Sequence, residues 1–282
     1  MPFRTQQLLA LAPLLLVSTA AAQSWYLQTG TGASFSGPLK HEGWNLDTVC
    51  YPNQSVCVQH SGYRWNYDLP SDLGRTVSAA LGRYRGQLRV EVASRYVKRN
   101  LDQEFTSITF LDGGALPPPA ESSDYSSTVF SSIGEFSSRS VLLAAYYRLR
   151  PNDQKISPYF GAGAGLSMVH ISNIHYAERY HCEAVVCLPD ASTYDNLQLT
   201  SLTGHSVSGH FFAGLDYGMS TRTVLSAEAS FSALRKVTDQ LAYLYHGVPG
   251  LTSETTISAI RQFALTVKVR RNFGRPRLRG RR

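Results

Sequence analysis

Apolar and polar side chains alternate along most of the chain with a period of two, which is typical of β-strands whose faces meet different surroundings. In residues 157–170, for example, Phe160, Ala162 and Leu166 alternate with glycine and serine. The same alternation predicts eight strands, at residues 25–35, 75–84, 87–98, 139–149, 157–170, 206–217, 225–233 and 262–273. One face of these strands is apolar and almost free of charge, whereas the other is rich in glycine and serine.

The segments between the strands differ in length in a regular way. Three are short, near residues 85–86, 151–156 and 219–222, and four are long, at about 37–74, 100–138, 171–204 and 235–257. Bacterial outer-membrane barrels combine short periplasmic turns with long extracellular loops. The pattern therefore predicts an all-β fold, an eight-stranded antiparallel up-and-down transmembrane β-barrel over residues 23–273, with both termini periplasmic. Residues 104–111 and 128–136 could pair as a hairpin that extends the third and fourth strands, and ten strands is the alternative count.

The charged side chains of the strands lie on the polar face. A soluble barrel or a β-sandwich would instead hide its apolar face and expose charge to water. Charges inside a narrow eight-stranded barrel are expected to pair and to fill the interior, with a small ion-conducting pore as the alternative. We expect Glu228 to reach Lys268 or Arg270, and Glu91 to reach Arg148. The predicted interior network consists of Arg89, Glu91, Arg148, Asp216, Glu228, Lys268 and Arg270.

The two ends of the chain differ in composition from the strands. Residues 1–22 contain Arg4, an apolar run over 8–17 and small residues ending in Ala20-Ala21-Ala22, which predicts a secretory signal peptide cleaved before Gln23. An uncleaved anchoring helix is the alternative. The chain has 27 Lys+Arg against 20 Asp+Glu, and residues 274–282 alone hold five arginines. The excess of positive charge therefore describes a periplasmic tail, and we expect no binding of nucleic acid.

Four cysteines in an exported chain predict disulfides. Three connectivities are open, and the local pairs Cys50–Cys57 and Cys182–Cys187 are the simplest because each closes a short loop. Zinc ligation by Cys182 and Cys187 with neighbouring histidines is the alternative, but the spacing is not a zinc pattern. We therefore expect no metal and no cofactor.

Three segments resemble a known family of membrane barrels. They are Ser157-Pro158-Tyr159-Phe160-Gly161-Ala162-Gly163-Ala164-Gly165, Phe212-Ala213-Gly214-Leu215-Asp216-Tyr217, and a final strand that ends in Phe273. Together they are similar to the opacity-type family, the bacterial outer-membrane β-barrel domain proteins, over residues 24–273. The resemblance implies a surface protein of the cell outer membrane, in some members an adhesin or immune target, without a shared catalytic site. It also implies that the barrel-assembly machinery reads Phe273, although here an arginine tail follows that residue.

One short motif suggests an enzymatic alternative. His170-Ile171-Ser172-Asn173 resembles the H-x-S-N segment of lipid A 3-O-deacylase, in which the histidine is the base, the serine the nucleophile and the asparagine an oxyanion donor. No acid that would orient His170 is evident, so we expect no catalytic activity. The sequence instead predicts a monomeric surface scaffold for adhesion or interaction. Its expected partners are outer-membrane lipid and lipopolysaccharide, the assembly machinery, and a host or extracellular ligand bound by the loops.

Overall fold

The computed structural model describes residues 25–57, 59–121, 123–149 and 155–273. The predicted signal peptide, residues 1–22, and the arginine tail, residues 274–282, lie outside the described residues. Within the described part, no helix is long and apolar enough to cross a membrane.

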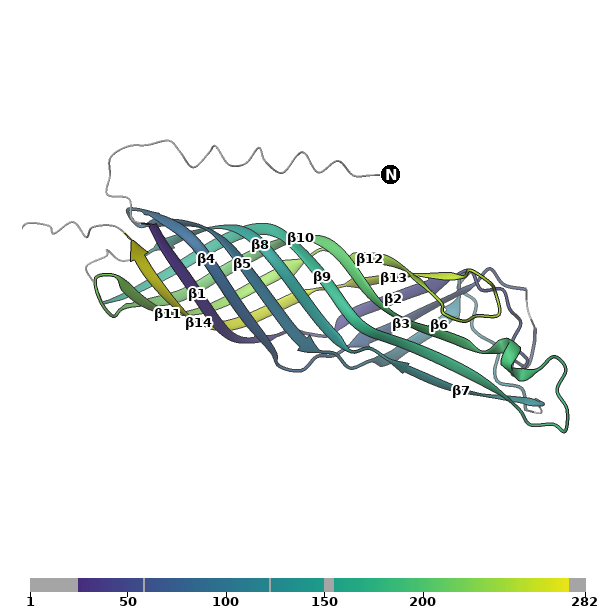
Figure 1. Cartoon of the computed structure of the whole chain (residues 1–282). Coiled ribbons are helices and arrows are strands. Elements are labelled where there is room, and N and C mark those ends of the chain that lie inside the picture. The colour runs from purple at the N-terminus through teal and green to yellow at the C-terminus, as the bar shows by residue number, and fades with distance from the viewer. Residues whose placement is uncertain (1–24, 58, 122, 150–154, 274–282) are drawn as a thin grey trace, which may run out of the picture.

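Eight antiparallel strands form a closed barrel (Figure 1). Each pairs with its two neighbours, and the pairing of the first strand with the last closes the ring. All eight predicted segments begin or end within a few residues of the observed strands, and the predicted fold class is confirmed. In order around the ring, the strands are β1 (Trp25–Phe35), β4 (Gly74–Arg85), β5 (Leu88–Asn100), β8 (Glu135–Arg148), β9 (Ile156–Cys182), β10 (Asn196–Gly218), β11 (Thr223–Leu234) and β14 (Arg261–Phe273).

The segments expected as long loops contain strands of their own. A second, five-stranded sheet consists of β12 (Val237–Ala242), β13 (Thr252–Ser258), β2 (Leu39–Asn45), β3 (Tyr63–Leu69) and β6 (Glu104–Phe110), in that order. A further strand, β7 (Tyr125–Ser132), pairs with the outer part of β9, and a short 3-10 helix, η2 (Ala191–Tyr194), precedes β10. These elements continue the barrel as an extension along its axis (Figure 1). In β6 and β7 most side chains are exposed or half-buried on both faces, so the alternation that marks a strand is weak there.

The hairpin expected from residues 104–111 and 128–136 does not form. Both segments are strands, but β6 pairs with β3 and β7 pairs with β9. The β5–β8 ladder ends at Asn100 and Glu135, beyond which the two chains diverge. Each segment then pairs with a strand that continues the barrel into the extension. β6 pairs with β3, which precedes β4 in the chain, and β7 pairs with the outer part of β9.

The outer face of the barrel is apolar and the inner face is closely packed. Burial alternates residue by residue along β8 and β14, with the apolar side chains exposed and the polar ones buried. Leu81, Leu143 and Leu265 are each more than half exposed on this surface. An apolar belt of this extent is stable when lipid covers it. Inside, a Cβ at Gly82 would come within 2.2 Å of the Tyr26 ring, so glycine leaves the space that this ring fills.

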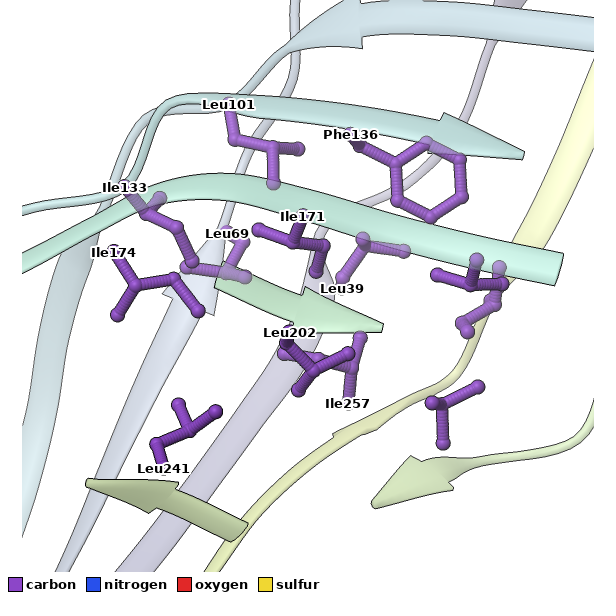
Figure 2. Packing of buried hydrophobic residues seen from close by; sticks show 13 residues of the cluster. Leu39, Leu69, Leu101, Ile133, Phe136, Ile171, Ile174, Leu202, Leu241 and Ile257 are labelled. Carbon is purple, nitrogen blue, oxygen red and sulfur yellow. The ribbon is translucent and has the colours of Figure 1, made fainter. Parts of the chain in front are cut away.

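The interior contains three layers along the axis. Buried ion pairs and tyrosines fill the barrel proper. Where the barrel strands pass into the extension, a buried apolar cluster crosses the inside of the tube (Figure 2). Above it, the extension encloses a second polar layer with aromatic rings. The apolar cluster, which we call the dry layer, consists of Leu39, Leu69, Leu101, Ile133, Phe136, Val169, Ile171, Ile174, Leu202, Val237, Leu241, Ile257 and Ile260.

Candidate interaction surface

The interior charges of the barrel form ion pairs. Lys268 Nζ lies 2.6 Å from Glu228 Oε1, which is one of the two predicted partners, and Tyr159 donates a hydrogen bond of 3.0 Å to the same carboxylate. Arg270 Nη2 lies 2.6 Å from Asp216 Oδ1. All of these groups are buried. The polar face therefore holds a paired network and not a row of free charges.

The predicted pair between Glu91 and Arg148 is wrong. Glu91 is opposite Ala144 in the β5–β8 register, and Arg148 lies several residues further along β8. Glu91 instead accepts hydrogen bonds from Tyr26 at 2.7 Å and Tyr146 at 2.8 Å. Arg148 lies over the Tyr84 ring, 4.3 Å from its centroid.

Arg89 is held mainly by aromatic rings. Its guanidinium lies 3.9 Å from the centroid of Tyr146 and 4.8 Å from that of Tyr159. The nearest acidic atoms, on Glu91 and Asp216, are both 3.8 Å away. Burial of a charge without close ion pairing is compensated here by cation–π contact. The sequence pattern placed Arg89 on the correct face but gave no sign of the tyrosine cage.

The deacylase-like residues lie close in sequence, but His170 has another hydrogen-bond partner in this structure. His170 and Ser172 share the outer face of β9, but His170 Nδ1 is hydrogen-bonded to Thr203 Oγ1 at 2.8 Å. No hydrogen bond joins His170 to Ser172 among the described residues. Asn173 has a positive φ of 56° and marks a kink in β9.

A buried polar cluster fills the upper interior. Asp47 accepts a hydrogen bond of 2.7 Å from Tyr51 and lies 3.4 Å from His246 Nε2. Burial acts to raise the pKa of Asp47, but hydrogen bonds from His246, the Val49 N–H and Tyr51 outweigh it, so this pKa lies below its usual range. Asn196 donates to the Tyr51 hydroxyl at 3.0 Å and so ties β10 to the cluster. Because Asp47 and His246 are both almost fully buried, the cluster supports the extension and offers no open site.

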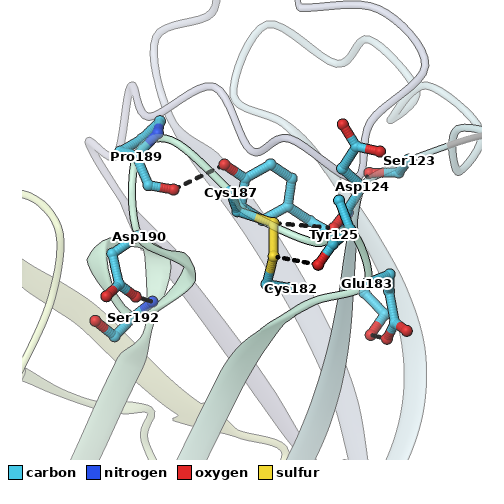
Figure 3. Close-up of a disulfide and its surroundings, with 11 residues drawn as sticks. Ser123, Asp124, Tyr125, Cys182, Glu183, Cys187, Pro189, Asp190 and Ser192 are labelled. Carbon is cyan, nitrogen blue, oxygen red and sulfur yellow. Dashed lines mark hydrogen bonds between the residues drawn. A yellow bond between two sulfur atoms is a disulfide. The ribbon is translucent and has the colours of Figure 1, made fainter.

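The segment between β9 and η2 lies at the far end of the extension (Figure 1), and Figure 3 shows the disulfide within it. The disulfide Cys182–Cys187 closes it, and the second disulfide, Cys50–Cys57, is also present, so both predicted local pairs occur. Within and beside the loop closed by Cys182–Cys187, Val185 is fully exposed, Leu188 is 88% exposed and Val186 is 70% exposed. Three neighbouring apolar side chains without cover are unusual outside a membrane or an interface. We call Val185, Val186 and Leu188 the apolar tip.

Hydrogen bonds fix the apolar tip from both sides. The Glu183 N–H donates to the Asp124 carbonyl at 2.8 Å, which joins the loop to β7. The Tyr125 hydroxyl donates to the Pro189 carbonyl at 2.7 Å (Figure 3). Asp190 caps η2 by accepting from the Ser192 N–H at 3.0 Å. The alternation of apolar and polar residues does not mark this site, although two adjacent valines between closely spaced cysteines are a visible signal.

Comparison with known proteins adds only a likeness of fold. No protein-family model matches the chain, and no curated protein does. The chain is similar to the solved structure of Neisserial surface protein A, with 14% identity over 90% of this chain and 100% of that chain and a TM-score of 0.40. It is similar to the outer membrane protein OprG from Pseudomonas aeruginosa, with 10% identity over 90% and 97% and a TM-score of 0.46. It is also similar to Ail, the attachment invasion locus protein of Yersinia pestis, with 11% identity over 86% and 98% and a TM-score of 0.29. The membership of the opacity-type family stays a prediction.

We predict that Glu228→Ala destabilises the barrel more than removal of an exposed loop charge such as Glu121. The substitution leaves the buried Lys268 ammonium without its carboxylate, and uncompensated buried charges cost about 3–5 kcal/mol. The measurement is the urea midpoint of the detergent-refolded protein, followed by heat modifiability on gels. Equal midpoints for Glu228→Ala and Glu121→Ala would contradict the network.

We predict that acid weakens the extension through His41, which is 5% exposed and stacks on Tyr67. Burial lowers the pKa of His41 to about 4, below its unfolded value, so the unfolded state binds the proton first. Stability is then lost as the pH falls from about 6.5 to about 4, by on the order of 3 kcal/mol. Limited proteolysis of residues 37–74 between pH 4 and 7 measures it. His41→Phe, which keeps a ring in place, should flatten this pH dependence, and an unchanged profile would reject the assignment.

Proposed function

We propose that the protein is an integral outer-membrane barrel without catalytic activity that holds a rigid extension outside the cell and presents the apolar tip to an extracellular partner. The observation that carries the proposal is the continuity of the wall. The barrel strands β9 and β10 run unbroken from the apolar belt into the extension, as strands of 27 and 23 residues. A strand of that length is far longer than a bilayer crossing of about 9–11 residues requires.

The distribution of apolar surface supports membrane insertion. The belt of exposed leucine, valine and phenylalanine surrounds the eight barrel strands, while the extension exposes serine, threonine and charged residues interspersed with apolar side chains such as Phe105, Val129 and Phe130. Lipid favours the continuous apolar belt, and the mixed surface of the extension is compatible with water. With the short turns at the opposite end, this arrangement favours an extension that faces the outside of the cell.

The three interior layers argue against a pore. The salt-bridged layer fills the barrel, and the dry layer closes the tube where the extension begins. An ion would have to displace buried side chains of both layers. The interior side chains therefore stabilise the barrel, and the outer surfaces are the ones that contact partners.

The position and rigidity of the apolar tip favour an interaction role. The tip lies at the end of the extension, where a partner outside the cell would meet it first (Figure 1). Disulfide closure and the bonds to β7 hold it in one shape, which reduces the entropy lost on binding. Glu183 and Asp190 flank the loop, so a partner with an apolar pocket and a basic rim would be complementary.

We predict that the double variant Val185→Ser/Val186→Ser binds epithelial cells about tenfold less well than the native protein when each is displayed on a non-adherent bacterium. Two valines buried on binding contribute enough for a tenfold change or more. Val56→Ser, an exposed valine in the other disulfide loop, is the matched control and should bind normally. Adhesion of the double variant at the native level would reject the tip, and no adhesion by the native protein would reject the adhesive function.

We also predict that the native protein gives no steady single-channel conductance in planar bilayers, because the dry layer and the ion pairs close the tube. Recordings across a range of voltages decide this. Large, stable openings from the native protein would favour a pore over a scaffold.

A further inference from the structure

The apolar belt ends at basic side chains on the side that faces the extension. On every barrel strand except β1, the outward-facing position that follows the last apolar residues of the belt carries arginine, lysine or histidine. None of these positions carries an acid. We call these residues the basic ring: Arg75 on β4, Lys98 on β5, Arg139 on β8, His170 on β9, His205 on β10, Arg235 directly after β11, and Arg261 on β14.

The opposite boundary of the belt has a different composition. Large aromatic side chains dominate it, accompanied by a few arginines such as Arg83, which lies over the Trp25 ring. The exposed aromatic residues there are Trp25, Tyr147, Phe160, Tyr217 and Phe273. The two rims therefore suit two membrane faces of different chemistry.

Three cations of the basic ring lie on neighbouring strands. Arg75 is directly opposite Lys98 in the β4–β5 register, and Arg139 is opposite Tyr96, one outward position from Lys98 on the same strand. Like charges directly opposite each other in a sheet are destabilising unless an anion lies between them. Lys98 pairs with Glu135 at 2.8 Å, whereas Arg75 and Arg139 form no ion pair with any described residue.

We propose that this part of the basic ring binds the phosphates of an acylated, diphosphorylated glycolipid in the outer leaflet, with the acyl chains against the apolar belt. The assignment rests on the proposed membrane location. Guanidinium groups bind phosphate in a bidentate manner, and the adjoining apolar surface accepts only a ligand that also carries acyl chains. The site therefore combines cations that bind phosphate with an apolar surface that contacts acyl chains.

The width of the site favours a diphosphorylated head group over a single phosphate. Neighbouring strands lie about 4.8 Å apart, so the backbones that carry the cations on β4, β5 and β8 span roughly 10 Å. A single phosphate could contact Arg75 and Arg139 together only if both side chains converged on it. Two phosphates on one rigid sugar head group can each contact one arginine without that convergence.

The test compares lipids that share some of these features. The full chain in neutral detergent is titrated with diphosphorylated lipid A, chemically dephosphorylated lipid A, phosphatidylglycerol and inorganic phosphate, and the thermal unfolding midpoint is followed. Only diphosphorylated lipid A should raise the midpoint strongly. Arg75→Gln/Arg139→Gln should weaken its apparent affinity by about tenfold or more, because each arginine contributes a charged hydrogen bond. Arg85→Gln/Arg271→Gln, which removes the same charge at the other rim, should leave it unchanged.

Each other outcome overturns a stated part of the proposal. Equal stabilisation by dephosphorylated lipid A would show that acyl chains alone bind, and equal stabilisation by phosphatidylglycerol would reject the diphosphorylated head group. A response to inorganic phosphate alone would reject the role of the belt. Unchanged lipid A affinity in Arg75→Gln/Arg139→Gln would reject the basic ring. Recovery of the native protein in a soluble fraction would instead reject the membrane location, so the two failures are distinguishable.

Discussion

Closure of the backbone hydrogen-bond ladder is the constraint on which the rest of this structure depends. In hydrocarbon no water can satisfy a free N–H or C=O group, so a sheet can cross a bilayer only as a closed ring. Here β1 and β14 pair along their whole length, from Trp25 opposite Phe273 to Phe35 opposite Phe263. With eight strands the ring is narrow, and its interior must be filled by side chains. The glycines and serines of the inner face, and the pairing of the charges there, follow from that width.

The same constraint explains why the interior is layered. Charged side chains such as Arg270 and Glu228 are tolerated inside because Asp216 and Lys268 neutralise them at close range. Beyond the belt the strands no longer have to face lipid, so they can separate, bend and pair with other strands. That change occurs at the dry layer, where the inside becomes apolar. The lumen is therefore closed by packing at the level where the wall itself is least regular.

The extension converts the barrel into a support for distant contacts. Because β9 and β10 continue without a break, the apolar tip is connected to the barrel by paired strands and not by a flexible loop. In the proposed orientation the tip faces away from the cell, and the rim at the base of the extension lies at the membrane surface. Both surfaces expose side chains that the chain covers only in part: the valines of the tip are exposed, and Arg75 and Arg139 of the rim have no carboxylate partner among the described residues.

The sequence by itself determined the class of fold, the eight barrel strands and the direction of their faces, and it favoured the local disulfide pairs among three possible connectivities. These features depend on a period of two and on short spacings, both of which are local. It also predicted that Glu228 pairs with Lys268 or Arg270, because adjacent strands carry those residues on one face, and the structure selects Lys268. Only the tertiary structure decided that Arg148 does not pair with Glu91 and that β6 and β7 pair with different strands. It also decided that tyrosine rings surround Arg89 and that Val185 and Val186 are exposed. Register, strand exchange and exposure depend on contacts between residues far apart in the chain, and no local pattern records them.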